Sequence, residues 1–258
     1  MKSSKTLVSL LVAAFLLGAA PGLFAAEIAP AGRPALRVGV TPNSPPMIFK
    51  SGKNIAGVEA DCALALGRAL GREVQFVEVP WPELIDALNA GKIDIIMSSM
   101  SMTRPRQFRV AFSDPYLRVG QMALVRADEK YLIGPFAASL NKRTVGVKKG
   151  TTGDLLMQQE FPTVKRKFYT SGEDAAKALK KGKIDLFIND STMIWYLGGI
   201  YESEGLVVSP QALTDEVLAW AVNRSDVELL ASVNGFLKNA RASGELDRVL
   251  HRWIPRLK

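Results

Sequence analysis

Short apolar blocks alternate along the chain with longer amphipathic segments. The short blocks predict strands, which we place at 36–40, 73–79, 93–97, 144–147, 184–188 and 215–222. The longer segments, several of them bounded by proline or glycine, predict helices at 57–70, 82–90, 226–241 and 245–253, with another starting near Asp154. This alternation is typical of an α/β fold.

One unit of the pattern occurs twice. The segment Ala87–Asp94 is echoed by Ala178–Asp185, and Val38–Val40 is echoed upstream by Val145–Val147. The distance between the copies is too long for a solenoid repeat and suits two similar α/β lobes. Chance similarity between common helix–glycine–strand units is the alternative, and it is enough to explain the second, shorter match taken alone.

The order of the copies predicts a chain that crosses between two lobes twice. We expect a first lobe built from 27–122 and from a return segment at 214–258, with the second lobe at 123–213. The crossings, near 120–125 and 211–217, would then lie close together and form a two-segment hinge.

The N-terminus has the composition of a secretory signal peptide. Two lysines precede an apolar run over 7–20, and small residues continue to Ala26. We therefore expect a cleaved signal at 1–26, with the cut near Ala25 or Ala26, and a periplasmic protein. A retained membrane anchor is the alternative, although the run is short for a membrane span.

Charge and rare residues limit the other classes of function. The net charge is +8, but the basic residues are scattered, and the densest cluster, 165–167, lacks interleaved aromatic residues. We therefore expect a solvated surface and no nucleic-acid partner.

Cys62 is the only cysteine and His251 the only histidine, so an internal disulfide and a structural zinc site are excluded. We expect Cys62 to be buried, and we expect no metal, cofactor or catalytic residue.

Polar residues follow three of the predicted strands, at the strand ends where α/β sheets bind ligands. Hydroxyls and a guanidinium in 98–106 form a receptor for a carboxylate. The segment 149–153 precedes a helix, and free N–H groups at a helix start attract anions, although Thr152 as an ordinary N-cap is the alternative. Asp190 suits a ligand ammonium, and capping of the next helix is its alternative.

Together these segments predict one anion receptor drawn from both lobes and one carboxylate that faces it. That combination suits a zwitterion with adjacent carboxylate and ammonium groups. Trp81 would add an apolar wall for the side chain of the ligand, unless it only caps the start of its helix.

A set of short motifs extends this pattern in a fixed order over most of the chain: 36–40, Pro45-Pro46, 57–61, 81–85, 87–94, 101–103, Arg106, 112–116, 149–152 and 244–253. With these motifs the chain resembles the family 3 amino-acid solute-binding proteins of ABC importers, which are type II periplasmic binding proteins. The resemblance implies a two-lobed α/β fold with a mixed sheet in each lobe. It also implies a monomer that delivers a small amino acid or analogue to an ABC permease in the inner membrane.

The resemblance also implies roles for single residues. The ligand carboxylate would be bound by Arg106, Ser101 and Thr152, the ammonium by Asp190 and Ser99, and the side chain by Trp81, with Thr151, Ser44 and Thr41 completing the site. Ser44 stands where the family often has an aromatic residue, and Thr41 stands where members that bind basic side chains often have an acid. These departures favour a neutral or polar ligand.

An enzyme and the sensing domain of a receptor are the two other classes of protein that this pattern suits. The family resembles cyclohexadienyl dehydratases, which depart from the Lys-Gly-Thr-Thr type of loop and place an acid in the cleft. Because 149–152 keeps that loop, we expect a binding protein and not an enzyme. The sensing domain of a receptor would need an appended domain, and we expect none after Lys258.

Overall fold

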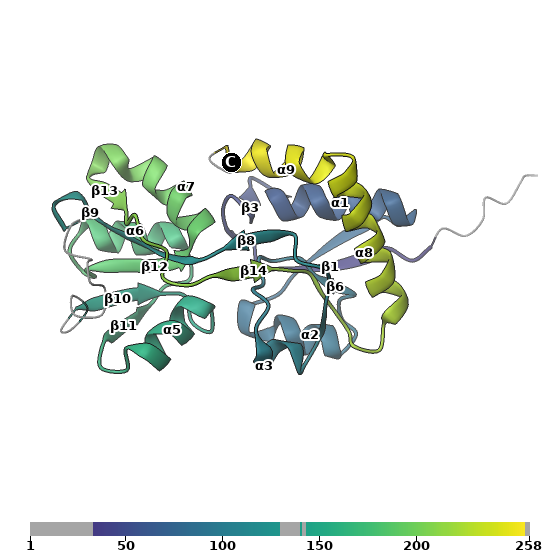
Figure 1. Ribbon diagram of the computed structural model, residues 1–258, viewed down its shortest axis with the longest axis horizontal. Coiled ribbons are helices and arrows are strands. Elements are labelled where there is room, and N and C mark those ends of the chain that lie inside the picture. Colours follow the sequence, from purple (N-terminus) through teal and green to yellow (C-terminus); the bar gives the residue numbers. More distant parts are fainter. Residues whose placement is uncertain (1–32, 130–139, 141–142, 256–258) are drawn as a thin grey trace, which may run out of the picture. The chain divides into compact units, whose positions relative to one another are not determined.

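Two mixed β-sheets, each flanked by helices, form the fold (Figure 1). The computed structural model describes residues 33–129, 140 and 143–255, so the expected signal peptide at 1–26 lies outside the described residues. No helix in the described ranges is both long and apolar enough to cross a membrane.

The first sheet has the strand order β5-β1-β6-β15-β7. Its strands are β1 (Leu36–Val40), β5 (Val74–Glu78), β6 (Ile95–Ile96), β7 (Ala111–Phe112) and β15 (Ala221–Val222). β1 runs parallel to both neighbours, whereas β15 is antiparallel to β6 and β7. Its helices are α1 (Val58–Leu70), α2 (Leu84–Asn89), α3 (Arg104–Gln107), α8 (Val227–Ala242) and α9 (Glu245–Trp253). A small three-stranded sheet precedes α1, formed by β2 (Asn43–Ser44), β3 (Ile48–Ser51) and β4 (Asn54–Ala56).

The second sheet has the strand order β11-β10-β12-β9-β13. Its strands are β9 (Gln121–Arg126), β10 (Thr144–Val147), β11 (Lys165–Phe168), β12 (Leu186–Asp190) and β13 (Leu206–Val208). Its helices are α5 (Thr152–Glu160), α6 (Gly172–Lys180) and α7 (Ser191–Tyr201). The predicted mixed α/β architecture is therefore confirmed, although α5 begins two residues earlier than expected.

An antiparallel ribbon of β8 (Leu117–Val119) and β14 (Glu216–Leu218) runs between the two sheets (Figure 1). The predicted single strand at 215–222 is wrong, because it is divided into β14 in this ribbon and β15 in the first sheet. Between them the backbone N–H of Ala219 donates to Met100 O, which redirects the chain into the first lobe. The lobe limits near 122 and 213 stay a prediction.

The repeated unit has the same backbone bonds in both copies. The carboxylate of Asp94 accepts from the Arg37 N–H at 2.9 Å, and that of Asp185 accepts from the Thr144 N–H at 2.7 Å. Each aspartate N–H also donates to the carbonyl of the same partner, at 2.8 Å in both copies. The echo in the sequence thus reports a real structural duplication.

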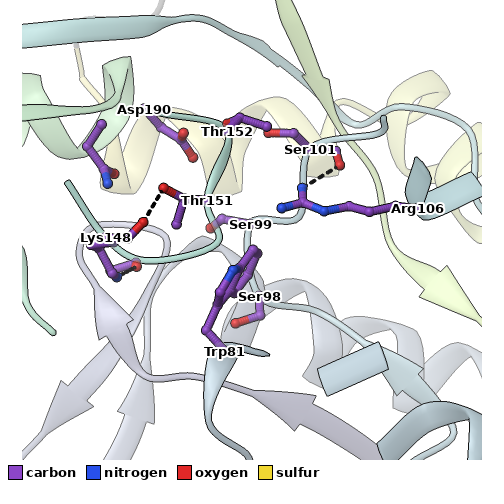
Figure 2. Close-up of a pocket in the computed structure, with 11 residues that line it drawn as sticks. Trp81, Ser98, Ser99, Ser101, Arg106, Lys148, Thr151, Thr152 and Asp190 are labelled. Atoms are coloured by element: carbon purple, nitrogen blue, oxygen red, sulfur yellow. Dashed lines mark hydrogen bonds between the residues drawn. The ribbon is translucent and has the colours of Figure 1, made fainter. Parts of the chain in front are cut away.

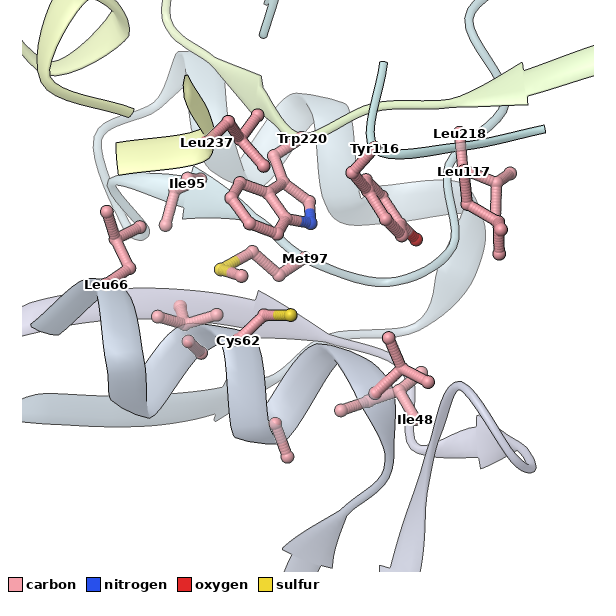
Figure 3. Packing of buried hydrophobic residues seen from close by; sticks show 14 of the residues in the cluster. Ile48, Cys62, Leu66, Ile95, Met97, Tyr116, Leu117, Leu218, Trp220 and Leu237 are labelled. Atoms are coloured by element: carbon pink, nitrogen blue, oxygen red, sulfur yellow. The ribbon is translucent and has the colours of Figure 1, made fainter. Parts of the chain in front are cut away.

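The core of the first lobe is shown in Figure 3. Trp220, Met97 and Leu66 are fully buried there, and Cys62 lies among them as expected. Burying an apolar side chain of this size stabilises the fold by about 1.5–3 kcal/mol. Trp220 stacks on Tyr116 with ring centroids 5.3 Å apart. Both aromatic residues lie next to the interlobe ribbon, so the ribbon is anchored in this core.

Candidate functional site

A pocket lies between the loops that follow the strands of the two sheets (Figure 2). Its lining residues are Ser44, Trp81, Ser98, Ser99, Ser101, Arg106, Lys148, Thr151, Thr152, Asn189 and Asp190. Eight of the nine residues predicted from the sequence are thus brought together, and three lining residues were not predicted.

Thr41 is the predicted residue that the structure places elsewhere. Its hydroxyl donates to Val79 O at 2.7 Å, and its backbone N–H donates to Ser98 Oγ at 2.9 Å. Thr41 therefore ties the end of β1 to its neighbours and does not line the pocket.

Arg106 lies in α3 and supplies the buried cation of the first lobe. Its Nη1 donates to Ser101 O at 2.8 Å, and its Nη2 donates to Gly150 O of the second lobe at 3.3 Å. Its guanidinium also lies over the Trp81 ring, 5.3 Å from the ring centre. Burial lowers the pKa of Arg106 below its usual value, but a guanidinium stays charged in proteins.

The start of α5 faces Arg106 from the second lobe. Thr151 is the N-cap residue, but its side chain makes no capping hydrogen bond and its hydroxyl donates to Lys148 O at 2.7 Å. Thr152 is not the cap, and its hydroxyl accepts from Gln121 Nε2 at 3.0 Å. The N–H groups of the first helical turn therefore have no side-chain cap, which suits an anion.

Asp190 ends β12 and supplies the carboxylate of the pocket. It precedes α7 without capping it through its side chain, so that alternative is wrong. Its Oδ1 accepts from Gln121 Nε2 at 2.6 Å. Burial, reinforced by the charge of Glu216, raises the pKa of Asp190 to about 6, while Lys148 and Arg106 oppose the shift.

Lys148 is a lining residue that sequence analysis missed. Its ammonium donates to Asn43 Oδ1 at 2.6 Å and to Ser44 Oγ at 2.8 Å, across the two lobes. Burial lowers the pKa of Lys148 to about 8. Its place directly after β10 is the available signal, but Lys149 carries the same side chain and is exposed. The sequence does not tell which lysine faces the cleft.

Ser98 and Asn189, the other unpredicted lining residues, belong to segments whose neighbours were predicted. Ser99 stands out beside them, because it is the one non-glycine residue in the described ranges with a positive φ, 57°. Its hydroxyl oxygen is buried and has no hydrogen-bond partner. A strained residue with an unused polar atom is frequent in ligand sites.

The pocket is small when the two lobes are in contact. Its cavity of about 30 Å³ holds roughly two water molecules. Trp81 Nε1 donates to Gly150 O at 3.2 Å, so loops of the two lobes touch across it. An organic ligand would therefore enter only if the lobes or these loops moved apart.

Comparison with known proteins agrees with this geometry. Residues 36–256 match the family described as bacterial extracellular solute-binding proteins, family 3. A probable histidine-binding protein of Neisseria gonorrhoeae is 29% identical over 254 residues, which cover 95% of this chain and 93% of that protein. The family match includes every residue that lines the pocket.

Two solved structures are similar over both lobes. A mutant of ArgBP from T. maritima is 33% identical, with a TM-score of 0.79 over 86% of this chain and 96% of that one. An ancestral amino acid-binding protein, AncCDT-1, described as a precursor of cyclohexadienyl dehydratase, is 34% identical with a TM-score of 0.78. That match covers 85% of this chain and 94% of the other.

Proposed function

Since the chain belongs to the bacterial extracellular solute-binding proteins of family 3, we propose that it captures a free amino acid or a close analogue between its lobes. The observation that carries this proposal is the pairing of Arg106 and Asp190 in one pocket, each from a different lobe. A buried guanidinium beside uncapped helix N–H groups suits an α-carboxylate, and the opposed carboxylate suits an α-ammonium.

The side chain of the ligand would meet Lys148. Asp190 is the one carboxylate among the lining residues, and in this proposal it pairs with the ammonium of the ligand. A cationic side chain would then lie near Lys148 and Arg106 with no acid left to pair with it. We therefore infer a ligand whose side chain is neutral or accepts hydrogen bonds, although some relatives carry names that refer to histidine or arginine.

The family context supports a place outside the cytoplasmic membrane. We infer that the chain is secreted through a signal peptide at 1–26, works in the periplasm as a monomer and passes its ligand to an ABC permease. Hinge bending at the β8–β14 ribbon would open the pocket.

Binding without conversion is favoured over catalysis. AncCDT-1 is itself described as an amino acid-binding protein, although dehydratases descend from it. In this chain the carboxylate that lines the pocket has the ammonium as its proposed partner, so no second acid from the lining residues is assigned to proton transfer.

A thermal-shift screen against the common L-amino acids tests the proposal. A ligand at about 100 times its dissociation constant stabilises the protein by roughly 2.7 kcal/mol. We expect the largest shifts with neutral or acidic amino acids and smaller shifts with arginine, lysine and histidine. For the best ligand, the decarboxylated amine and the deaminated acid should each bind weakly in calorimetry. Absence of any shift would contradict the proposal.

A further inference from the structure

Glu59 is a fully buried carboxylate directly behind the pocket. Its Oε1 accepts from the Ser99 N–H at 2.7 Å and from the Tyr116 hydroxyl at 2.6 Å, and its Oε2 accepts from Trp220 Nε1 at 2.7 Å. None of the ion pairs within the described ranges includes Glu59. Three neutral donors therefore replace the cation that a buried carboxylate usually requires.

Two of the donors belong to the ends of the interlobe ribbon. Tyr116 immediately precedes β8, and Trp220 follows β14 after one residue. The Tyr116 N–H also donates to Leu218 O, and the two rings stack (Figure 3). A single carboxylate thus joins both crossing strands at the point where they enter the first lobe.

The third donor belongs to the pocket. Ser99 lines the pocket with a φ of 57°, a conformation that a residue with a side chain rarely adopts. The hydrogen bond from its N–H to Glu59 holds the peptide in that orientation. Ser99 thus lines the pocket with a buried hydroxyl oxygen that has no hydrogen-bond partner.

We propose that Glu59 is a positioning residue of the ligand site, which holds Ser99 in its left-handed conformation and ties the pocket wall to both interlobe strands. The proposal rests on the proposed function, because it assumes that the pocket binds an amino acid. Glu59 itself does not line the pocket, so it acts through Ser99.

The three hydrogen bonds are strongest with the ionised form of Glu59. A protonated carboxyl carries a hydrogen on one oxygen, so at least one of the three bonds must weaken or, with the Tyr116 hydroxyl, reverse its direction. Burial raises the pKa of Glu59 to about 7, although the three hydrogen bonds oppose the shift. The other titratable groups that face it are the Tyr116 phenol and the Cys62 thiol, and both are neutral at this pH.

Positioning and stability then respond to pH in opposite directions. Because the pKa of Glu59 is higher in the folded protein than its usual 4.5, folding gains stability as pH falls from about 7 toward 4.5. Ligand affinity should fall over the same change, since a neutral carboxyl accepts more weakly from the Ser99 N–H than a carboxylate does. A purely structural carboxylate would not produce this divergence.

The experiment compares wild type with Glu59→Gln, and the probe is the L-amino acid that gives the largest thermal shift in the screen. At pH 8 we expect Glu59→Gln to weaken binding about tenfold. The amide NH2 takes the place of one carboxylate oxygen and then faces one of the N–H or O–H groups that donate to Glu59 in wild type. Between pH 8 and 6.5 the affinity of wild type should fall relative to that of the variant, because Lys148, with a pKa of about 8, titrates in both proteins and its effect cancels in the ratio. Glu78→Gln, at an exposed glutamate of the same lobe, is the matched control and should behave as wild type.

Tyr116→Phe provides a second variant in case Glu59→Gln does not fold. It removes a hydrogen bond that lowers the pKa of Glu59, so the affinity midpoint should move to higher pH. Equal affinity and equal pH profiles for wild type, Glu59→Gln and Tyr116→Phe would overturn the role of Glu59 alone. A wild type that binds none of the amino acids would instead overturn the proposed function, and with it this proposal.

Discussion

The two lobes share one backbone plan but supply opposite chemistry to the pocket. In both, a glycine of the corresponding strand, β1 or β10, packs against an isoleucine of the repeated unit, Gly39 on Ile93 and Gly146 on Ile184. A methyl group added at these glycines would lie 2.2 Å and 2.6 Å from the respective isoleucine Cδ1 atoms, so neither strand accommodates a side chain there without a shift. The duplicated frame places two sets of strand ends opposite each other.

What differs is the loop that each strand end carries. The first lobe contributes the guanidinium of Arg106, whereas the second contributes the carboxylate of Asp190. In each lobe a lining residue is also bonded to a residue behind the pocket: the Ser99 N–H donates to Glu59 in the first lobe, and Asp190 accepts from Gln121 in the second. The comparison shows that duplication conserves the frame and leaves the loops free to take on different charges.

Removing one charged group from each lobe is the most direct way to break the comparison. We expect Arg106→Ala and Asp190→Ala each to weaken amino-acid binding at least about thirtyfold, because truncating one partner of a buried charge pair costs roughly 2–5 kcal/mol. Calorimetry at pH 8 measures both. Arg109→Ala and Asp128→Ala, at exposed positions of the same lobes, are the controls.

The two variants should also differ in which ligand analogue they tolerate. Arg106→Ala should discriminate less against the decarboxylated amine, and Asp190→Ala less against the deaminated acid. If Arg106→Ala bound as tightly as wild type, the carboxylate receptor would lie elsewhere in the pocket.

Titration separates the lobes without any substitution. In the proposed site the ammonium of the ligand pairs with ionised Asp190, and burial raises the pKa of Asp190 to about 6. Affinity should therefore fall by roughly tenfold per pH unit below pH 6, because a protonated Asp190 must lose its proton before it can pair with the ammonium. The unliganded protein should respond with the opposite sign, gaining stability from Asp190 as pH falls through 6 toward 3.8.

Calorimetry in several buffers between pH 4.5 and 8 measures this titration. Glu59→Gln keeps the decline below pH 6 while losing the one near pH 7, so the two groups can be told apart. An Asp190→Asn variant whose affinity still declines below pH 6 would show that another group is responsible.

Lys148 gives a smaller effect that sharpens the difference in charge between the lobes. Lys148→Gln removes the ammonium that we propose faces the side chain of the ligand, and it also weakens the contact with Asn43 and Ser44. We expect affinity for an acidic or amide amino acid to drop about tenfold, and affinity for arginine to rise relative to it. Competition between the two ligands measures the ratio. Lys149→Gln is the control at the exposed neighbour.

Much of this arrangement follows from local sequence patterns, and the rest depends on tertiary contacts. Five of the six predicted strands, the five predicted helices and eight lining residues agree with the structure, because glycines at helix ends and polar residues at strand ends are local signals. Short strands such as β2, β11 and β13 were not predicted. The division of 215–222 was not predicted either, since it depends on the contact of Ala219 with Met100, which is distant in sequence. Lys148 and Glu59 were missed for the same reason, because what each side chain faces is decided by another element.

The smallest expected effect concerns the aspartate that accepts a backbone N–H at the equivalent position of each lobe, Asp94 in the first and Asp185 in the second. Asp94 receives hydrogen bonds from the Arg37 N–H and from the guanidinium groups of Arg37 and Arg72. Asp185 receives the Thr144 N–H and has one arginine, Arg126, within 3.6 Å. Burial opposes the shift, but the bonds from Arg37 and the charge of Arg72 lower the pKa of Asp94 below its usual value.

Asp94→Asn should therefore lower the free energy of unfolding by about 1–2 kcal/mol, and Asp185→Asn by about 0.5–1 kcal/mol, since asparagine keeps one acceptor but loses the charge. The part due to Asp94 is present above its usual pKa and disappears as pH falls through its lowered folded pKa. Urea unfolding of both variants at pH 7 and near pH 3 measures this difference. If the two variants lost equal stability at pH 7, the second arginine of the first lobe would contribute nothing, and the two copies would be energetically as well as geometrically alike.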